Sequence, residues 1–367
     1  MKKITLLSLL LLSTFIHSQT SLKSFQHTSG TRKYFIHLPA NYNTSTQYPL
    51  LLVLHGLTDS IQSHMPYTGF NGIADQENFI VVYPQALVGS SGTCWNAGAP
   101  LISPNADDVD FLTDLIDTIT KNHSVNKARV YMTGFSMGGF MTQRMAKEVS
   151  NKIAAVATFA STQFFAFLNT NPTRPIPISM GHGLTDIVVN PAGNFVLAYT
   201  SLNNSWNDWK SSNSCIGSEI IDTLPDLAND GARVIRSRLL NCNAGVQMQM
   251  LKITNVGHEY LLKPAYDISY PWEAWNFVKN YTHPYAGMDD IEVNNLFDFY
   301  PNPSNDFIFI DKNSSVEAKS YSIYTIDGTK VTSTTTSPIN VSNLPKGFYT
   351  LVVESSKGLT LKKLVVN

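Results

Sequence analysis

The sequence predicts an α/β domain, in which helices cover both faces of a mostly parallel sheet, followed by a small all-β sandwich. Three observations support this prediction. Apolar runs alternate with helix-like segments up to about residue 283, which is typical of parallel sheets with crossover helices. One such run leads through a Gly-x-Ser-x-Gly turn into a helix. Residues 297–367 hold only short β-rich runs separated by turn residues.

The first eighteen residues resemble a secretory signal peptide. Lys2 and Lys3 precede an apolar core at residues 6–16, and His17-Ser18 leads into a polar segment. The core is shorter than the about 20 apolar residues that span a bilayer, and no later segment is apolar enough. We therefore expect export without a membrane span.

The strands and helices of the first domain can be assigned in chain order. Residues 31–39 alternate loosely and predict an edge strand, whereas the run from Tyr48 to Leu57 and the run at 79–84 are apolar throughout and predict buried strands. Residues 105–122 carry an apolar stripe at helical spacing, with acidic residues at its start. Further strands are expected at 128–133, 153–160, 175–180 and 246–256, and helices at 137–150 and 270–281.

These assignments divide the chain into four parts: a signal peptide at 1–18, an α/β domain at 19–283, a linker at 284–296 and a β-sandwich at 297–367. The formal net charge of −1 and the lack of a basic run argue against a nucleic-acid partner. We expect a monomer.

The chain contains three cysteines. In an oxidising compartment two can pair. Cys215 and Cys242 both lie in polar, Asn- and Ser-rich surroundings, so we predict a disulfide between them. Cys94 would then be a free, small, buried apolar residue.

Gly134-Phe135-Ser136-Met137-Gly138 lies between an apolar strand and a helix. Strand, sharp turn and helix form the nucleophile elbow, which lifts a serine hydroxyl above the edge of the sheet. The flanking glycines permit the strained turn and the close approach of the helix to the strand. The pattern therefore predicts Ser136 as a nucleophile.

A serine nucleophile needs a base, and the base needs an orienting acid, in the chain order Ser, Asp or Glu, His. His258 follows the predicted strand at 246–256 and is the candidate base. Asp186 follows the strand at 175–180 and is the candidate acid. Asp222 and Asp226 remain alternatives for the acid, although neither follows an apolar strand.

Two backbone N–H groups are candidates to hold an oxyanion. Met137 follows the nucleophile, and Leu57 follows an early central strand. His55 precedes the serine and is expected to shape the loop. Trp95 and Phe135 lie on loops near the predicted site and are candidates for an apolar substrate surface.

Several short motifs occur in an order that resembles the secreted esterases grouped with polyhydroxybutyrate depolymerases and feruloyl or acetylxylan esterases. The resemblance covers about residues 25–282. The matching pieces are Leu54-His55-Gly56, Tyr83-Pro84, Cys94-Trp95-Asn96-Ala97-Gly98, residues 106–112, 134–139 and 182–186, and Gly257-His258.

This resemblance implies an α/β-hydrolase fold, no cofactor, and Ser136, Asp186 and His258 as the catalytic triad. It also supports the Cys215–Cys242 pair. The sequence departs from the family around His258, where many relatives have Gly-Gly-Gly-His-x-Trp-Pro and this chain has residues 255–261 instead. The pocket on that side is therefore expected to differ.

The C-terminal segment is similar to the sorting domain of the type IX secretion system. The matching residues are Tyr300-Pro301-Asn302-Pro303, residues 323–328 and 344–349, and the ending at 362–366. The resemblance implies the secretion machinery as a partner and export across a bacterial outer membrane to the cell surface or beyond. A plain β-sandwich that binds carbohydrate or packs on the enzyme is the alternative.

Three functions are compatible with these residues. The first is a secreted serine esterase that cleaves feruloyl or acetyl esters of plant walls, polyhydroxybutyrate or an aromatic polyester. The second is a serine peptidase of the prolyl-oligopeptidase type, but the chain shows no propeller repeat. The third is a non-catalytic cell-surface binding protein, against which an intact set of Ser136, Asp186 and His258 argues.

Overall fold

The computed structural model describes residues 19–284, 296–312, 316–325, 329–355 and 358–367. The chain divides into two compact units, Met1–Gly287 and Met288–Asn367. The predicted signal peptide at 1–18 and most of the predicted linker at 284–296 lie outside the described residues. Among the described helices, none is both long and apolar enough to cross a bilayer.

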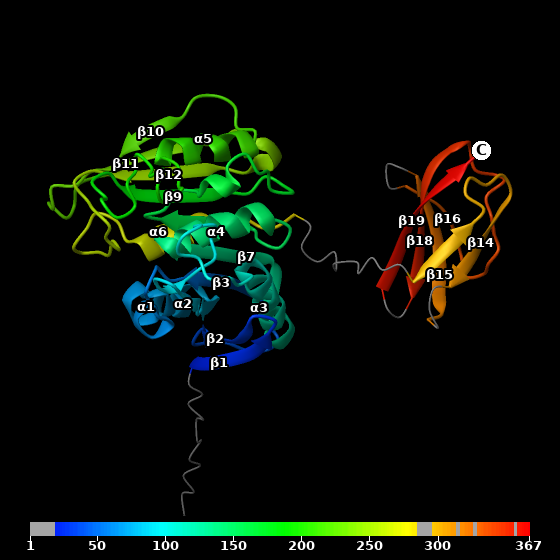
Figure 1. Ribbon diagram of the computed structural model, residues 1–367, viewed down its shortest axis with the longest axis horizontal. Coiled ribbons are helices and arrows are strands. Elements are labelled where there is room, and N and C mark those ends of the chain that lie inside the picture. The colour runs from blue at the N-terminus through cyan, green and yellow to red at the C-terminus, as the bar shows by residue number, and fades with distance from the viewer. Residues whose placement is uncertain (1–18, 285–295, 313–315, 326–328, 356–357) are drawn as a thin grey trace, which may run out of the picture. The chain divides into compact units, whose positions relative to one another are not determined.

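One ten-stranded sheet forms the centre of the first unit within residues 19–284 (Figure 1). Its strand order is β1-β2-β4-β3-β7-β8-β9-β12-β11-β10. All neighbours from β4 through β12 are parallel, whereas the outer strands on both sides pair antiparallel. The strands are β1 (Thr20–His27), β2 (Gly30–His37), β3 (Tyr48–Leu54), β4 (Ile80–Pro84), β7 (Val125–Phe135), β8 (Ala155–Phe159), β9 (Ile178–Gly183), β10 (Ile220–Thr223), β11 (Val234–Leu239) and β12 (Met248–Ile253).

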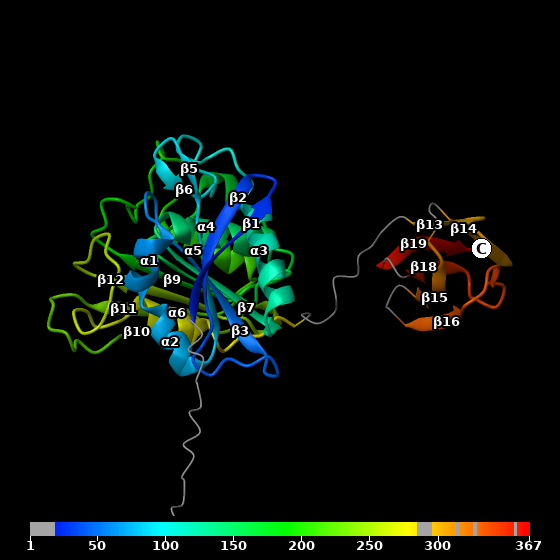
Figure 2. The ribbon, with the colours of Figure 1, turned by 90° about the horizontal axis from the view of Figure 1, so that it is seen from below.

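Helices cover both faces of this sheet (Figure 2). They are α1 (Ile61–Thr68), α2 (Phe70–Glu77), α3 (Asp108–Asn122), α4 (Met137–Glu148), α5 (Leu202–Ser212) and α6 (Tyr270–Val278). Residues of α3, α4 and α5 share one apolar cluster, and those of α1, α2 and α6 share another. A small hairpin, β5 (Leu87–Gly89) with β6 (Gly92–Cys94), stands apart from the sheet. This arrangement confirms the predicted α/β-hydrolase fold.

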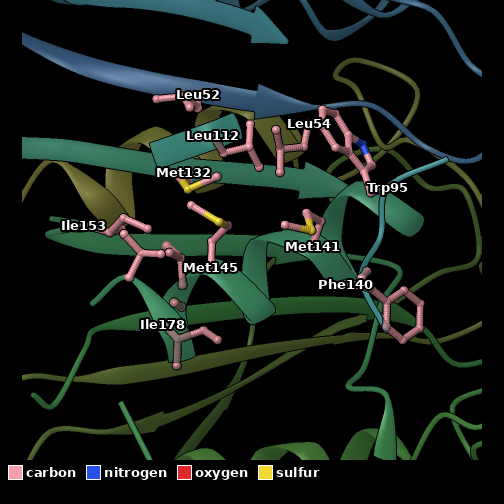
Figure 3. Packing of buried hydrophobic residues seen from close by; sticks show 14 of the residues in the cluster. Leu52, Leu54, Trp95, Leu112, Met132, Phe140, Met141, Met145, Ile153 and Ile178 are labelled. Carbon is pink, nitrogen blue, oxygen red and sulfur yellow. The ribbon is translucent and has the colours of Figure 1, made fainter. Parts of the chain in front are cut away.

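Strand β3 shows why both faces need a cover. Leu50, Leu52 and Leu54 point into the cluster with α3 and α4, while Leu51 and Val53 point into the opposite cluster. Because side chains alternate along a strand, an unbroken apolar run is apolar on both faces. Figure 3 shows side chains of β3 and β7 meeting those of α3 and α4 in the first of these clusters.

The parallel sheet brings three connecting segments to one edge. Phe135 at the end of β7 pairs with Phe159, and Ile253 at the end of β12 pairs with Gly183 at the end of β9. Because carboxyl ends of parallel strands meet at the same edge, the residues after β7, β9 and β12 gather there. This edge positions the site described below.

Some elements differ from the sequence predictions. The strand predicted at 31–39 is not an edge strand, since β1 pairs with β2 along its whole length and forms the edge. Alternation of apolar and polar residues shows that one face of a strand is exposed to solvent, but it does not show whether another strand pairs with its edge. The hairpin β10–β11 and helix α5 were not predicted, because polar residues on their exposed faces interrupt the apolar pattern.

The cysteines behave as predicted. Cys215 and Cys242 form a disulfide that joins the segment after α5 to the segment after β11. Cys94 is free and buried. Burial raises the pKa of the Cys94 thiol to about 12, so it remains protonated and packs as a small apolar side chain.

Two antiparallel sheets form the second unit around one apolar core. Ile308 and Ile339 come from one sheet, and Ile323, Leu351 and Leu364 come from the other. This matches the predicted small β-sandwich. Its strands are β13 (Phe297–Tyr300), β14 (Phe307–Lys312), β15 (Ala318–Thr325), β16 (Lys330–Thr334), β17 (Ile339–Asn340), β18 (Gly347–Ser355) and β19 (Gly358–Val366).

Candidate active site

Ser136 sits on a sharp turn between β7 and α4, and its backbone has φ of 54° and ψ of −124°. Non-glycine residues rarely adopt this conformation, so the surroundings must enforce it. The Ser136 N–H donates to the carbonyl of Phe159 at 2.9 Å, and the Ser136 carbonyl accepts from the N–H of Gly139 at 2.8 Å. These bonds tie the turn to the neighbouring strand and to the first turn of the helix.

The two glycines around Ser136 allow the close approach that the turn requires. A Cβ added at Gly134 would collide with the backbone of Gly138, and a Cβ added at Gly138 would collide with the carbonyl of Leu54 in β3. Both obstacles are backbone atoms, which cannot swing aside as a flexible side chain can. The Gly-x-Ser-x-Gly spacing therefore follows from packing α4 directly onto β3 and β7.

The structure brings Ser136, His258 and Asp186 together in one hydrogen-bonded row. His258 Nε2 lies 2.9 Å from Ser136 Oγ, and His258 Nδ1 lies 2.7 Å from Asp186 Oδ2. Because the carboxylate can only accept, Nδ1 carries the proton and Nε2 is left to accept from the serine hydroxyl. This tautomer suits a general base that removes the proton of Ser136.

The Asp186 side chain is completely buried, yet its carboxylate is well satisfied. Its Oδ1 accepts the N–H groups of Val188 and Val189, both at 2.8 Å. Burial alone would raise the pKa of Asp186, but the hydrogen bonds from His258 and Val189 and the nearby histidines outweigh it, so the pKa lies below its ordinary value. Asp186 is therefore an anion that can stabilise a protonated His258.

A second histidine lies behind the carboxylate. His182 Nε2 lies 2.8 Å from the carbonyl of Val189 and 3.5 Å from Asp186 Oδ2. The side chain is fully buried, and this burial lowers the pKa of His182, so its neutral ring donates to Val189. His182 thus supports the loop that carries Asp186.

The alternatives for the acid lie elsewhere. Asp222 belongs to β10 and pairs with Arg236 and Arg238. Asp226 pairs with Arg233. His258 contacts neither of them in the described part of the chain.

Leu57 and Met137 lie beside the nucleophile, as an oxyanion hole requires. Met137 directly follows Ser136, and a Cβ added at Gly56 would lie 3.5 Å from Ser136 Cβ, so the Gly56–Leu57 peptide passes next to the serine. Within the described residues, the Leu57 and Met137 N–H groups donate to no other protein group. Both are available to an incoming oxygen atom.

His55 orients the peptide that carries the Leu57 N–H. Its Nε2 accepts from the Ala86 N–H at 3.1 Å, so its Nδ1 holds the proton and donates to the Gly56 carbonyl at 2.7 Å. In a trans peptide the carbonyl and the following N–H point in opposite directions. The His55 bond to Gly56 therefore aims the Leu57 N–H away from His55.

The two predicted substrate aromatics have different positions. Phe135 is partly exposed, and its ring centroid lies 4.9 Å from that of His258. Trp95 has no exposed surface, its ring lies tilted against that of His55 with the centroids 5.2 Å apart, and its indole N–H donates to the His55 carbonyl at 2.9 Å. Trp95 therefore packs beneath the loop and is not part of a surface that a substrate reaches, contrary to the prediction.

An exposed apolar surface on the loop after β9 was not foreseen. Ile187 is 90% exposed and Phe195 is 88% exposed. We name these exposed residues the apolar rim; Phe165 follows β8, and the other members follow β9, namely Leu184, Ile187, Val188, Phe195, Val196 and Leu197. Unbroken apolar stretches in loops were the available signal, but a sequence does not say whether such residues face solvent.

The apolar rim is joined to the site by direct contacts. The Val188 N–H is held by Asp186, and the ring of Phe195 lies 6.1 Å from that of Phe165. The neighbouring Phe164 packs against Phe140 of α4, with ring centroids 4.5 Å apart. The segment that carries Phe165 is thus packed on the helix that follows the nucleophile.

Buried polar side chains after β8 were also missed. Ser161 Oγ, Thr162 Oγ1 and both amide atoms of Gln163 have no hydrogen-bond partner among the described residues. Ser161 lies against Gly139 of α4. A Ser-Thr-Gln segment gives no pattern that distinguishes it from an ordinary loop.

Two groups of three side chains in the described chain could ligate a metal ion, His27 with Asp110 and Asp114, and Asp226 with Asp230 and Asp267. Neither group includes Ser136, His258 or Asp186.

Comparisons with known proteins identify both units. Residues 26–216 match the family model described as putative esterase, and this match spans Ser136 and Asp186. The chain belongs to the putative esterase family. Residues 298–367 match the secretion system C-terminal sorting domain, which confirms the predicted sorting domain and its implication of export to the cell surface or the extracellular space.

Curated relatives of this esterase-family chain span several ester substrates. It is 29% identical over 248 residues to a bifunctional acetylxylan esterase/xylanase of Neocallimastix patriciarum, covering 67% of this chain and 33% of that protein. It is 26% identical over 263 residues to feruloyl esterase B of Piromyces equi, covering 69% and 46%. It is 30% identical over 150 residues to poly(3-hydroxyalkanoate) depolymerase C of Paucimonas lemoignei, covering 40% and 36%.

The chain spans between a third and a half of the length of these relatives. Among solved structures, an acetyl xylan esterase from Aspergillus awamori is 16% identical with a TM-score of 0.49, and the match covers 66% of this chain and 96% of that one.

The first prediction concerns the elbow. Gly138→Ala should prevent folding or markedly lower stability and soluble yield, because its Cβ would collide with the Leu54 carbonyl. Gly72→Ala in α2 is the matched control, since no atom lies within 4 Å of its added Cβ. Thermal unfolding and soluble yield of both variants would be compared with those of the wild type. A Gly138→Ala protein of unchanged stability and activity would contradict the packing argument.

The second prediction concerns pH. Burial is the main cause that lowers the pKa of His55 to about 4, with His64 and Asp59 acting on it in opposite directions. The unfolded chain therefore binds a proton between about pH 6.5 and 4 that the folded chain excludes, and the stability from neutral His55 is lost as the pH falls through this window.

The variant His55→Gln should flatten this part of the pH dependence by about 2–3 kcal/mol, the free energy that such a shift represents. Urea unfolding of variant and wild type at pH 7.5 and pH 4.5 provides the measurement. Equal losses of stability in both proteins would show that His55 does not titrate as expected.

Proposed function

We propose that this protein is a secreted serine carboxylic-ester hydrolase that works through an acyl-enzyme. The observation that carries the proposal is the hydrogen-bonded row from Ser136 through His258 to the buried Asp186. Membership in the putative esterase family supports an ester bond as the target. The sorting domain supports action outside the cell.

In the first half-reaction, Ser136 Oγ attacks the ester carbonyl carbon while His258 Nε2 takes the hydroxyl proton. The carbonyl oxygen becomes an oxyanion and accepts hydrogen bonds from the N–H groups of Leu57 and Met137. Asp186 stabilises the resulting imidazolium. His258 then gives its proton to the alcohol oxygen, the ester bond breaks, and the acyl group remains on Ser136.

In the second half-reaction, water repeats these steps in place of the serine. His258 accepts a proton from water, and the hydroxide formed attacks the acyl carbon. The same two N–H groups hold the oxyanion. The tetrahedral intermediate then releases the acid and restores the hydroxyl of Ser136, with the proton returned by His258.

The candidate substrates are feruloyl or acetyl esters of plant walls, polyhydroxybutyrate and aromatic polyesters. The apolar rim favours a polyester among these. An exposed surface with several large apolar side chains typically marks a binding site for an apolar partner. A water-insoluble polyester offers such a partner, whereas an acetyl group on a hydrated polysaccharide does not. Phe135 beside His258 could contact the acyl group in either case.

The third prediction tests the reaction. Ser136→Ala should lower turnover at least about 10⁴-fold on every ester that the wild type cleaves, because no nucleophile remains. The panel is methyl ferulate, acetylated xylan, 3-hydroxybutyrate oligomers, an aromatic diester and p-nitrophenyl acetate. A folded wild type that cleaves none of them would refute the esterase proposal, and a peptide substrate run alongside would detect a peptidase.

The fourth prediction tests the substrate class. The double variant Phe195→Ser and Val196→Ser should lower hydrolysis of polyester particles at least about fivefold relative to hydrolysis of p-nitrophenyl acetate, since adsorption depends on exposed apolar area. Ile221→Ser, a change at a residue 64% exposed in edge strand β10, is the control. An unchanged ratio of the two activities in the double variant would argue against the polyester.

A further inference from the structure

Three carboxylates outside the proposed triad meet on two loops of the first unit. Asp226 and Asp230 belong to the loop between β10 and β11, and Asp267 lies just before α6. One oxygen atom of each lies within 4.8 Å of the others. Like charges held this close repel one another, and a cation bound between them would offset this repulsion.

Asp267 is the buried member of this cluster, with 7% of its surface exposed. Its Oδ1 accepts the N–H groups of Leu227 at 2.6 Å and Ala228 at 2.9 Å. Its Oδ2 is buried and has no hydrogen-bond partner among the described residues. A buried carboxylate oxygen without a partner is costly, so this atom calls for a cation or a proton.

The charges around the cluster favour a cation. In the described part of the chain, Arg233 is the only basic side chain that forms an ion pair with one of the three, and its partner is Asp226. Arg233 is half exposed, and it can offset one of the three negative charges. Asp230 and Asp267 have no such partner, which leaves a surplus of negative charge beside a buried oxygen.

We propose that Asp226, Asp230 and Asp267 bind a calcium ion. Carboxylate and backbone carbonyl oxygens are the ligands of hard cations, and calcium accepts the irregular geometry that two loops provide. Magnesium demands a near-ideal octahedron and keeps its water, which suits such a site less well. With few protein carboxylates, we expect an affinity in the range of extracellular calcium modules.

The bound ion would join two segments that flank the proposed active site. Asp267 follows Tyr266, whose hydroxyl donates to Glu259, and Glu259 directly follows His258. The Tyr266–Glu259 bond thus closes the segment from 259 to 266 into a loop, and Asp267 directly follows this loop. Calcium would attach this segment to the β10–β11 loop and so stabilise the position of the residues that follow His258.

Calcium titration of the full-length protein after chelator treatment tests this site. Calorimetry at constant ionic strength should show saturable binding with a Kd between about 0.1 and 1 mM. Saturating calcium should raise the thermal midpoint by about 3–5 °C. Magnesium should bind at least about tenfold more weakly. Absence of saturable calcium binding by the folded wild type would overturn the proposal.

Two variants locate the ion. Asp267→Asn keeps an acceptor for Leu227 and Ala228 but removes the charge, and Asp230→Asn makes the same change at an exposed position that tolerates substitution. Each should weaken calcium binding at least about tenfold. Asp114→Asn, in the half-exposed group with His27, is the control and should bind calcium as the wild type does. Wild-type affinity in both cluster variants would overturn the assignment.

Hydrogen exchange provides a readout that does not depend on activity. Calcium should slow amide exchange in residues 224–232 and 259–269 of the wild type and of Asp114→Asn, but not of Asp230→Asn. Should the wild type bind no calcium and Asp267→Asn be more stable than the wild type, the cluster would hold no ion, and the proposal would fail.

Discussion

The direct contact of α4 with β3 and β7 is the constraint on which the site depends. It is possible only because Gly134 and Gly138 lack side chains where backbone atoms meet. The contact forces the turn at Ser136 into a positive φ, and the hydrogen bond to Phe159 holds it there. A strained turn held from several sides keeps the hydroxyl and the following N–H in place without help from a substrate.

The polar groups of the site are arranged by burial and by backbone donors. Asp186 is buried, but two N–H groups and His258 keep it charged. His55 is buried and neutral, and it orients the Gly56–Leu57 peptide because its Nε2 accepts a hydrogen bond from Ala86 while its Nδ1 donates one to the Gly56 carbonyl. Each buried ionisable group thus has a state determined by its partners, which is the condition for a preorganised site.

The two units of the chain serve separate purposes. The sorting domain has its own apolar core and two antiparallel sheets, so it does not need the first unit to complete it. Export places the esterase-family unit in an oxidising medium, where the Cys215–Cys242 bond is stable. Calcium is also abundant outside cells, which makes a carboxylate site on a surface loop chemically reasonable there.

The buried central strands and the elbow could be predicted from the sequence because each depends on local patterning, and the fold they imply supplied the order in which Asp186 and His258 were sought after Ser136. An apolar run specifies a buried strand, and a glycine–serine turn specifies a sharp bend, whatever lies elsewhere. The outer strand β1, the hairpin β10–β11 and the burial of Trp95 could not be predicted, since they depend on which distant segments cover a given face. The apolar rim and the cluster around Asp267 likewise arise from segments far apart in the chain, and only folding determines their exposure and distance.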